Sequence, residues 1–108
     1  MIFVYNQRID LYPKEGINID RGTALGNPFS HIPNKGMFPV DSREDAVFAY
    51  ENWIRLKLEN KVEPYFSQFL KLKRIYEDTG ELHLVCWCKP LPCHGDIISK
   101  IIDGDEWL

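Results

Sequence analysis

The segment that most constrains the fold is residues 81–104, where a strand-like run, a turn rich in cysteine and proline, and a helical pattern follow one another. The run ELHLVCWC, residues 81–88, has β character, and its even-numbered side chains share one face of a regular strand. His83 faces the other way, so we expect it to pack there or to lie half exposed. Isoleucines then recur at helical spacing until Asp103 and Gly104, which predicts a helix from about residue 93.

Two short strands and two helices are predicted earlier in the chain. Residues 2–5 are apolar and β-prone, and residues 17–19 alternate apolar and polar side chains. Ser42 suits a helix cap, and the apolar stripe behind it predicts an amphipathic helix over residues 42–59. A second helix is predicted over residues 64–79, after which a glycine stops it.

This order of elements predicts an α/β fold, with a small sheet flanked by about three helices in a single domain over residues 1–108. The last strand, loop and helix are expected to form a Rossmann-like unit. In open sheets of that kind ligands bind at the carboxyl ends of the strands, and the cysteine turn falls at that position.

The loop between the second strand and the first helix, residues 22–39, is rich in glycine and proline. A loop of this length inside a compact domain is usually functional or mobile. Its side chains, together with the residue before it, are suited to hold a polar ligand; they are Arg21, Thr23, Asn27 and His31.

The charge balance gives no support to binding along a nucleic-acid backbone, because 13 basic and 16 acidic residues leave a formal net charge of −3. The basic residues of the second helix are expected to form a solvated face; they are Lys71, Lys73 and Arg74. Three aromatic residues could stack on bases, but we expect them to be packed and buried; they are Tyr65, Phe66 and Trp87.

The N-terminal sequence MIFVYNQRID lacks a charged segment followed by a long apolar stretch, so we expect a mature cytoplasmic protein, in the host cytoplasm for a phage-encoded chain. No run approaches the eighteen or so apolar residues that a membrane span needs. The three cysteines are an odd number and lie close together. They therefore favour reduced or metal-bound thiols over a secreted disulfide framework.

Metal binding is one interpretation of the cysteine turn. Its candidate ligands have the spacing Cys-x-Cys-x4-Cys-His, and they are Cys86, Cys88, Cys93 and His94. Four such groups suffice for a tetrahedral zinc site, and thiolate-rich sites favour zinc. Because neighbouring side chains at a helix start usually diverge, His31, a carboxylate or water is an alternative to His94 as the fourth ligand.

Thiol chemistry or anion binding is a second interpretation. Cys93 falls at the start of the last predicted helix, where N–H groups and the helix dipole lower the pKa of a thiol. His94 or Asp96 would then transfer protons. The same N–H groups would bind a phosphate or carboxylate, and Gly95 would let the anion approach the backbone closely.

A third interpretation is structural. Pro90 and Pro92 would fix a tight connection, the cysteines would be small buried hydrophobic residues, and Asp96 would cap the helix. The clustering of these residues at a strand-to-helix junction favours the functional interpretations.

Two motifs resemble those of an uncharacterised family of small proteins found mainly in phages and bacteria. The front motif is RGTALGNPF, residues 21–29, and the rear motif is CWCKPLPCHGD, residues 86–96. The resemblance spans about residues 17–102 and implies that both motifs build one shared site, without implying an activity. Many members have a glycine where this chain has Asp20.

We therefore predict a site that combines Arg21, Thr23 and Asn27 with the cysteine turn and binds an anionic small molecule such as a nucleotide or sugar phosphate. One hypothesis is an enzyme of nucleotide or nucleic-acid metabolism. In that enzyme Cys93 is the nucleophile or a metal ligand, and His94 or Asp96 is the acid or base. The alternative is a non-enzymatic binding or host-modulating protein whose cysteines hold a structural zinc.

Overall fold

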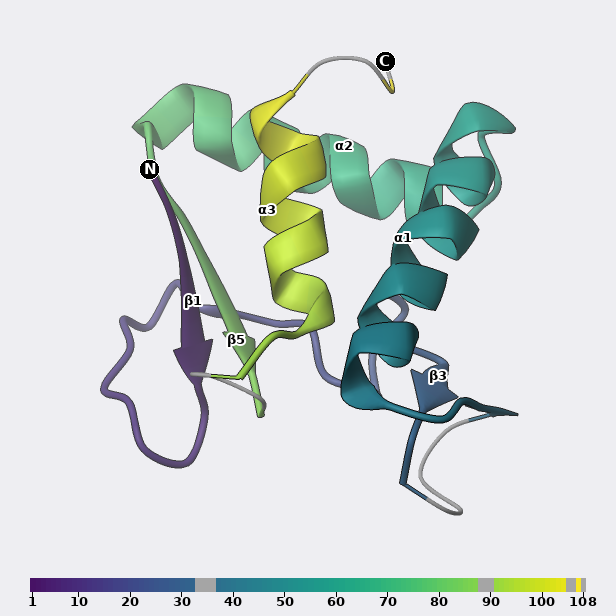
Figure 1. The fold of residues 1–108 in the computed structure, drawn as a ribbon. Helices are drawn as coiled ribbons and strands as arrows, with labels where there is room; N and C mark the ends of the chain where they lie inside the picture. Colours follow the sequence, from purple (N-terminus) through teal and green to yellow (C-terminus); the bar gives the residue numbers. More distant parts are fainter. Residues whose placement is uncertain (33–36, 88–90, 105–106, 108) are drawn as a thin grey trace.

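The computed structural model describes residues 1–32, 37–87, 91–104 and 107. In this part of the chain three helices stand beside a small parallel sheet (Figure 1). The helices are α1 (Arg43–Glu59), α2 (Tyr65–Thr79) and α3 (His94–Asp103). The strands of this sheet are β1 (Ile2–Asn6), β2 (Ile17–Asn18) and β5 (Leu82–Cys86). The predicted α/β class is confirmed, whereas the Rossmann-like detail stays a prediction.

The strand order is β1-β5-β2, and β5 pairs in parallel with both neighbours. Ile2 lies opposite Leu82, and Ile17 lies opposite Leu84. Because all three strands run in the same direction, their carboxyl ends meet at one edge of the sheet. The N-terminal ends of α1 and α3 lie on that same side of the molecule (Figure 1).

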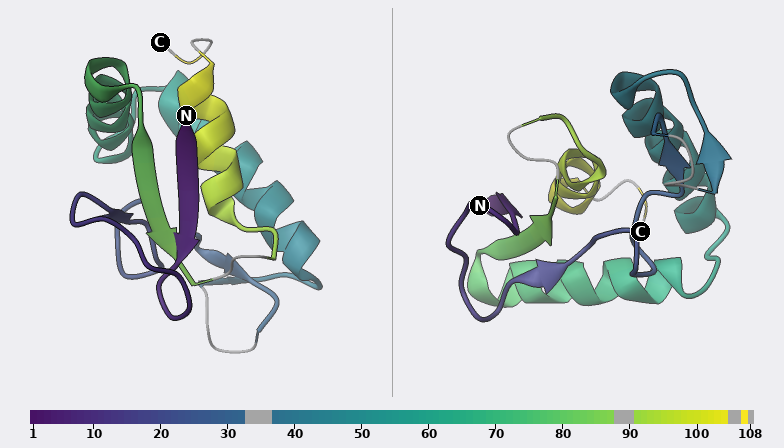
Figure 2. Two further views of the ribbon diagram at one scale, coloured as in Figure 1. Left: turned by 90° about the vertical axis from the view of Figure 1, so that its left-hand side faces the viewer. Right: turned by 90° about the horizontal axis from the view of Figure 1, so that it is seen from below.

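β5 is central because nearly all of its side chains are apolar. Leu82, Leu84 and Cys86 are buried on the face that α3 covers (Figure 2). On the opposite face the ring of His83 stacks on Phe3, with 5.1 Å between ring centroids, and the prediction of a packed, partly exposed histidine is confirmed. β5 ends at Cys86, shorter than predicted, and Cys88 lies outside the described residues.

The predicted helix starts are confirmed to within one residue. Ser42 caps α1 by accepting a hydrogen bond from the backbone N–H of Asp45. α2 begins one residue later than predicted, and Pro64 is its N-cap. α1 and α3 lie side by side in roughly the same direction, while α2 crosses behind them (Figures 1 and 2).

The apolar stripes of the helices and strands meet in one core. From α1 it takes Tyr50, Ile54 and Leu58, and α3 contributes four isoleucines. Burial of these side chains supplies most of the free energy that favours folding, at about 25 cal/mol for each Å² of apolar surface. Within the described residues, the longest apolar helical stretch falls short of what is needed to cross a bilayer.

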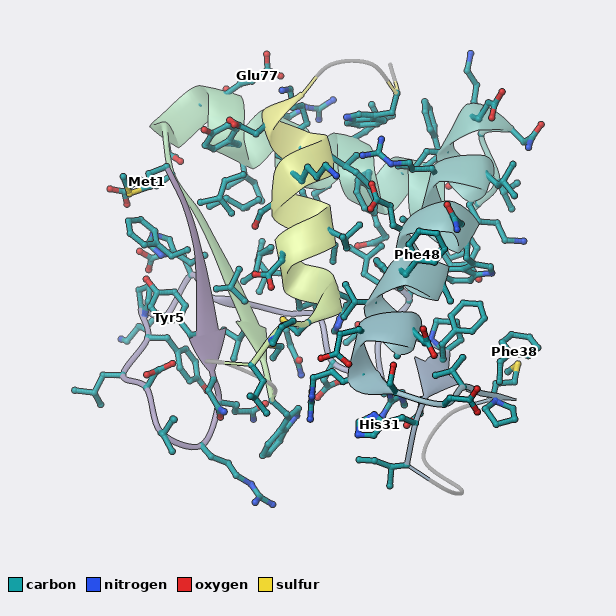
Figure 3. The ribbon with its side chains drawn as sticks, viewed as in Figure 1. Met1, Tyr5, His31, Phe38, Phe48 and Glu77 are labelled. Atoms are coloured by element: carbon teal, nitrogen blue, oxygen red, sulfur yellow. The ribbon has the colours of Figure 1, made fainter. Side chains whose placement is uncertain are left out.

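The expectation of an unbroken loop over residues 22–39 is wrong. Its described part contains two short strands that pair in parallel, β3 (Phe29–Ser30) and β4 (Phe38–Pro39). The rings of Phe29 and Phe38 lie 5.3 Å apart, so an aromatic contact accompanies the pairing. Figure 3 shows Phe38 and His31 at the end of the molecule where α1 begins.

The expectation of a solvated basic face on α2 is wrong for Lys73. Its side chain is buried, and its ammonium group donates a 2.7 Å hydrogen bond to the carbonyl oxygen of Ile102. Ile102 lies in the last turn of α3, where the helix dipole favours a positive charge. Lys73 therefore joins α2 to the C-terminal end of α3, while Lys71 and Arg74 are exposed as predicted.

Candidate functional site

A pocket of about 480 Å³ opens at the carboxyl edge of the sheet, and we call it the carboxyl-edge pocket. Its lining comes from the segments that follow each of the three parallel strands and from the start of α1. The side chains that matter below are Arg8, Asp20, Arg21, Asn27, His31, Arg43, Trp87, Cys93 and His94. The pocket thus brings residues of the front motif and of the rear motif together.

Arg21 fixes the shape of the front motif. Its Nε donates to the carbonyl oxygen of Asn27 at 2.8 Å, and one of its terminal nitrogens donates to that of Phe29 at 3.0 Å. Two of the five guanidinium N–H donors are used in these bonds, and they set the plane of the group. The side chain remains exposed at the edge of the pocket.

Asn27 joins the front motif to α1. Its amide nitrogen donates to the carbonyl oxygen of Ala46 at 3.0 Å, and its side-chain oxygen accepts from the N–H of Phe29 at 2.9 Å. The side chain is buried, so the bond to Ala46 forms away from water, while the bond from Phe29 is partly buried. A second buried link runs from the hydroxyl of Tyr50 to the carbonyl oxygen of Leu25 at 2.8 Å, and burial raises the pKa of that hydroxyl.

Two further positions of the front motif close its turn. The hydroxyl of Thr23 donates to the carbonyl oxygen of Asp20 at 2.8 Å, as its backbone N–H does at 2.9 Å. A Cβ atom on Gly26 would lie 2.3 Å from that same oxygen, so only glycine fits there. Thr23 does not line the carboxyl-edge pocket but lines a neighbouring one.

Cys93 is the N-cap of α3. Its side chain accepts from the backbone N–H of Asp96, and the Asp96 carboxylate accepts from the backbone N–H of Cys93 at 3.2 Å. This reciprocal pair is a capping box. The structural interpretation of Asp96 as a helix cap is therefore confirmed, and its role as an acid or base stays a prediction.

The thiols of Cys86 and Cys93 meet in the hydrophobic core, with 3.5 Å between their sulfur atoms, and Cys93 also lines the pocket. Both side chains belong to the hydrophobic core, so the structural interpretation of their packing is also confirmed. Cys93 reaches the pocket because the chain turns there from β5 into α3.

Gly95 lets α3 approach the sheet. A Cβ atom at this position would lie 2.9 Å from Cγ1 of Val4 and 3.1 Å from Cδ1 of Ile19. Because Gly95 has no side chain, α3 can pack closely against the sheet. Gly95 itself does not belong to the pocket lining.

His94 points to a different element from its neighbour Cys93. Its Nε2 lies 2.5 Å from the carbonyl oxygen of Ile19, and since that oxygen can only accept, Nε2 carries the proton. The ring also packs edge-on against Tyr50 with 5.1 Å between centroids. The buried imidazole thus joins the start of α3 to the end of β2 at the wall of the pocket.

Asp20 is the carboxylate of the pocket. It accepts hydrogen bonds from the indole N–H of Trp87, the amide of Asn18 and the backbone N–H of Gly22. Burial raises the pKa of Asp20, but these three bonds and the electrostatic effect of His94 outweigh it, so the pKa lies below its usual value. Asp20 thereby ties the front motif to the rear motif.

Trp87 departs from the expectation of buried packing, because 45 % of it is exposed. It lies one residue beyond the end of β5, at the edge of the sheet, where neighbouring strands no longer cover it. The guanidinium of Arg8 stands 5.1 Å from its ring centroid, which is a cation–π contact. Tyr65 and Phe66 are only partly buried and pack against the core.

The sequence analysis missed Arg8 and Arg43. Arg8 follows the end of β1 by two residues, and Arg43 is the first residue of α1. Arg8 lies outside the motifs, whereas Arg43 with Glu44 matches the helix entry of the family that the chain resembles. Their positions after a predicted strand and at a predicted helix start are the signal that could have identified them as site residues. His31, the alternative metal ligand, is exposed at the pocket.

Within residues 1–32, 37–87, 91–104 and 107, no group of three or more His, Cys, Asp or Glu side chains is placed to share a metal ion. Of the predicted zinc ligands, Cys86 and Cys93 converge, and Nε2 of His94 is bonded to a backbone carbonyl. Cys88 lies outside these residues.

Comparison with known proteins agrees with the resemblance to an uncharacterised family. The chain is 32 % identical over 88 residues to a protein of Enterobacteria phage T4 called "Uncharacterized 12.4 kDa protein in nrdA-td intergenic region", covering 81 % of this chain and 67 % of that one. No solved structure matches. A family described as "Domain of unknown function (DUF4326)" matches residues 4–104, almost the whole chain. The chain therefore belongs to the DUF4326 family.

Proposed function

We propose that the carboxyl-edge pocket binds a small anionic molecule, such as a nucleotide or sugar phosphate. The observation that carries this proposal is the convergence of three arginines, Arg8, Arg21 and Arg43, from three separate segments on one pocket. Asp20 is the only carboxylate among the described lining residues, so their formal charge is positive although the chain carries −3. The front and rear motifs act as one site in this proposal.

Arginine suits this role because its planar guanidinium offers paired donors that match the oxygens of a phosphate. Arg21 is held by its bonds to the backbone of the front motif, so little rotamer entropy is lost when a ligand binds. The N-terminal ends of α1 and α3 also face this side of the molecule, and their dipoles favour a negative charge there.

For an enzymatic role, Cys93 is the proposed reactive group, because its thiol lies at the pocket and at a helix start. His94 and Asp96 are the proposed proton carriers, and each already has a structural partner, Ile19 and Cys93 respectively. If Cys93→Ser binds the anionic ligand as tightly as wild type but no longer converts it into product, the thiol is identified as the nucleophile.

The test is equilibrium binding of ribose 5-phosphate and inorganic pyrophosphate to the wild-type chain and to Arg43→Gln. A charge-assisted hydrogen bond contributes about 1.5–3 kcal/mol, so we expect Arg43→Gln to weaken binding by roughly tenfold or more. Arg55→Gln is the matched control, since Arg55 lies on the same helix but pairs with Glu51 outside the pocket. Equal affinities for the two variants, or no binding of either probe to wild type at millimolar concentration, would contradict the proposal.

A structural zinc site is the second candidate, in which Cys86 and Cys93 would supply two of the four ligands. Two sulfur ligands of a tetrahedral zinc, each about 2.3 Å from the metal, lie roughly 3.8 Å apart. The Cys86 and Cys93 sulfur atoms are 3.5 Å apart, close to that separation. Elemental analysis of protein purified without chelator tests this candidate. About one zinc per chain, with unfolding on chelation, supports it, and a metal-free folded chain rejects it.

A further inference from the structure

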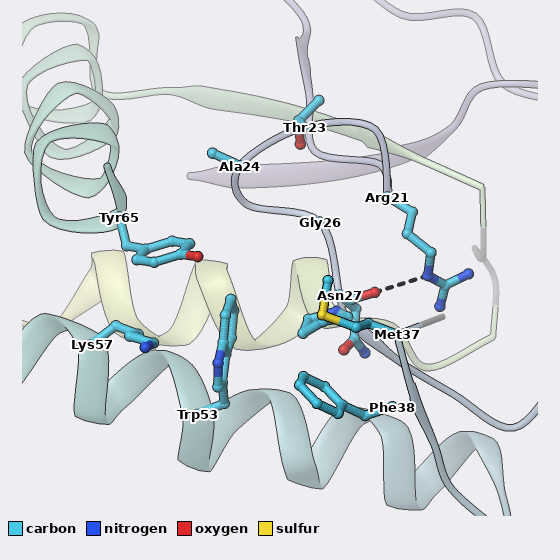
Figure 4. A pocket seen from close by; sticks show the side chains of 11 residues that line it. Arg21, Thr23, Ala24, Gly26, Asn27, Met37, Phe38, Trp53, Lys57 and Tyr65 are labelled. Atoms are coloured by element: carbon cyan, nitrogen blue, oxygen red, sulfur yellow. Dashed lines mark hydrogen bonds between the residues drawn. The ribbon is translucent and has the colours of Figure 1, made fainter. Parts of the chain in front are cut away.

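A second pocket, of about 560 Å³, lies on the other side of the front motif, and we call it the aromatic pocket (Figure 4). Its walls are the front motif, the beginning of β4, one side of α1 and the start of α2. The side chains used below are Arg21, Phe38, Trp53, Lys57 and Tyr65. Its volume is in the range of small-molecule sites, about 300–1,000 Å³.

Three aromatic rings line this pocket along α1. Figure 4 shows Trp53 between Tyr65 and Phe38. The rings of Trp53 and Tyr65 meet edge to face, with 5.1 Å between centroids and 73° between planes. Trp53 is only partly buried, so it keeps ring surface available to the pocket. Such rings bind planar aromatic groups by stacking.

The charged groups of the aromatic pocket are cations. The ammonium group of Lys57 stands 5.9 Å from the ring centroids of both Trp53 and Tyr65, so the rings help to position it. Arg21 is the second cation, and the described lining residues include no carboxylate. The pocket therefore complements an aromatic group that is attached to a negative charge.

The two pockets adjoin each other at the front motif. Arg21 and Asn27 line both of them. Arg21 is exposed, with its guanidinium fixed by the carbonyl oxygens of Asn27 and Phe29, so a single ligand could pass beside it from one pocket to the other.

We propose that the aromatic pocket holds the base of a nucleotide whose phosphate lies in the carboxyl-edge pocket. This proposal rests on the proposed function, because it places the phosphate with the three arginines. It narrows the ligand from any small anion to a nucleoside phosphate. The base stacks on the exposed surface of Trp53, and the ammonium group of Lys57 lies beside the same rings, where it can contact the base or its sugar.

The experiment compares the binding of adenosine 5′-monophosphate with that of ribose 5-phosphate, which has the same phosphate and sugar but no base. Stacking of one base on an aromatic ring contributes enough to raise affinity by about tenfold. We therefore expect the nucleotide to bind about tenfold more tightly to wild type. Trp53→Leu should remove this difference and leave the affinity for ribose 5-phosphate unchanged.

Trp53 also packs against the buried Tyr50. Lys57→Gln is therefore used as a second variant, because Lys57 lies outside the core. It should weaken nucleotide binding at least threefold. Lys61→Gln is its matched control, because Lys61 stands over Phe66 at 6.0 Å outside the pocket and should change nothing.

The outcomes separate the two proposals. Equal affinities of wild type for the nucleotide and for ribose 5-phosphate would overturn the base site while leaving the phosphate site in place. Binding of neither compound would overturn the proposed function itself. A base preference that survives in both Trp53→Leu and Lys57→Gln would place the base elsewhere and overturn the inference.

Discussion

The carboxyl-edge pocket and the aromatic pocket share a wall but are built from different parts of secondary structure. The first collects the ends of elements, namely three strand ends and two helix starts, where backbone N–H groups, arginines and a carboxylate gather. The second is beside α1, where Trp53 of that helix lies between Phe38 of β4 and Tyr65 at the start of α2 (Figure 4). The polar pocket is therefore built from the ends of helices and strands, whereas the aromatic pocket is built from rings that three different elements bring together.

Arg21 and Asn27 form the wall that the two pockets share. A substitution in this wall should have the largest effect on the stability of the fold. Asn27→Ala removes two hydrogen bonds and leaves the carbonyl oxygen of Ala46 and the N–H of Phe29 without these partners. Each buried group left in this way costs about 1–3 kcal/mol, so we expect a loss of about 3 kcal/mol in the free energy of unfolding, measured by urea denaturation. Asn52→Ala, at an exposed position of α1, is the control and should change stability by less than about 0.5 kcal/mol.

Gly95→Ala should damage only the carboxyl-edge pocket. The added methyl group would press against Val4 and Ile19 and push the start of α3 away from the sheet. Overpacking of this kind costs about 1–3 kcal/mol, and we expect about 2 kcal/mol by denaturation. The comparison variant is Gly104→Ala, whose Cβ would meet nothing closer than 3.7 Å. Similar stabilities of the two variants would mean that α3 does not need this close approach.

Tyr50→Phe should have a smaller effect on the shared wall. The variant loses the hydrogen bond to the carbonyl oxygen of Leu25 but keeps the buried ring. We expect a loss of about 1 kcal/mol, seen as a lower urea midpoint with an unchanged slope. If the urea midpoint of Tyr50→Phe equals that of wild type, the front motif keeps its conformation without this hydrogen bond.

Asp20→Asn should have the smallest effect, which is present at neutral pH and disappears in acid. The pKa of Asp20 in the folded chain lies below its unfolded value of about 3.9, so its ionised form stabilises the fold above that value. This stabilisation is lost as pH falls through the folded pKa. Between about pH 5 and pH 3, the free energy of unfolding of Asp20→Asn should therefore fall less steeply than that of wild type. Asp78→Asn, on the exposed end of α2, should keep the wild-type slope.

The main helices and strands could be predicted from the sequence because their apolar residues repeat with clear periods. The strands β3 and β4 could not be, since they lie within a segment whose glycines and prolines predict a loop. Lys73 was misassigned because it is one of three basic residues close together on α2, of which Lys71 and Arg74 are exposed. Only the position of α3 in space shows that its ammonium group is buried.

The candidate site could be predicted in part. The two polar motifs indicated where it lies, but the sequence does not show that Arg8 and Arg43 reach the same pocket, because that follows from the parallel order of the strands. Trp53 was expected to pack in the core rather than to bind a ligand. Its spacing along α1 is that of an ordinary core residue, and its partial exposure depends on how the front motif passes over it.

The pairing of β1 with β5 also determines when the sheet can form. Ile2 lies opposite Leu82, eighty residues further along the chain, so β1 has no neighbour until almost the whole chain has been synthesised. Contacts between such distant residues close slowly, because the entropy of the long intervening segment must be lost first. The sheet therefore closes late in folding, and a chain that stops before β5 leaves β1 as an unpaired edge open to aggregation.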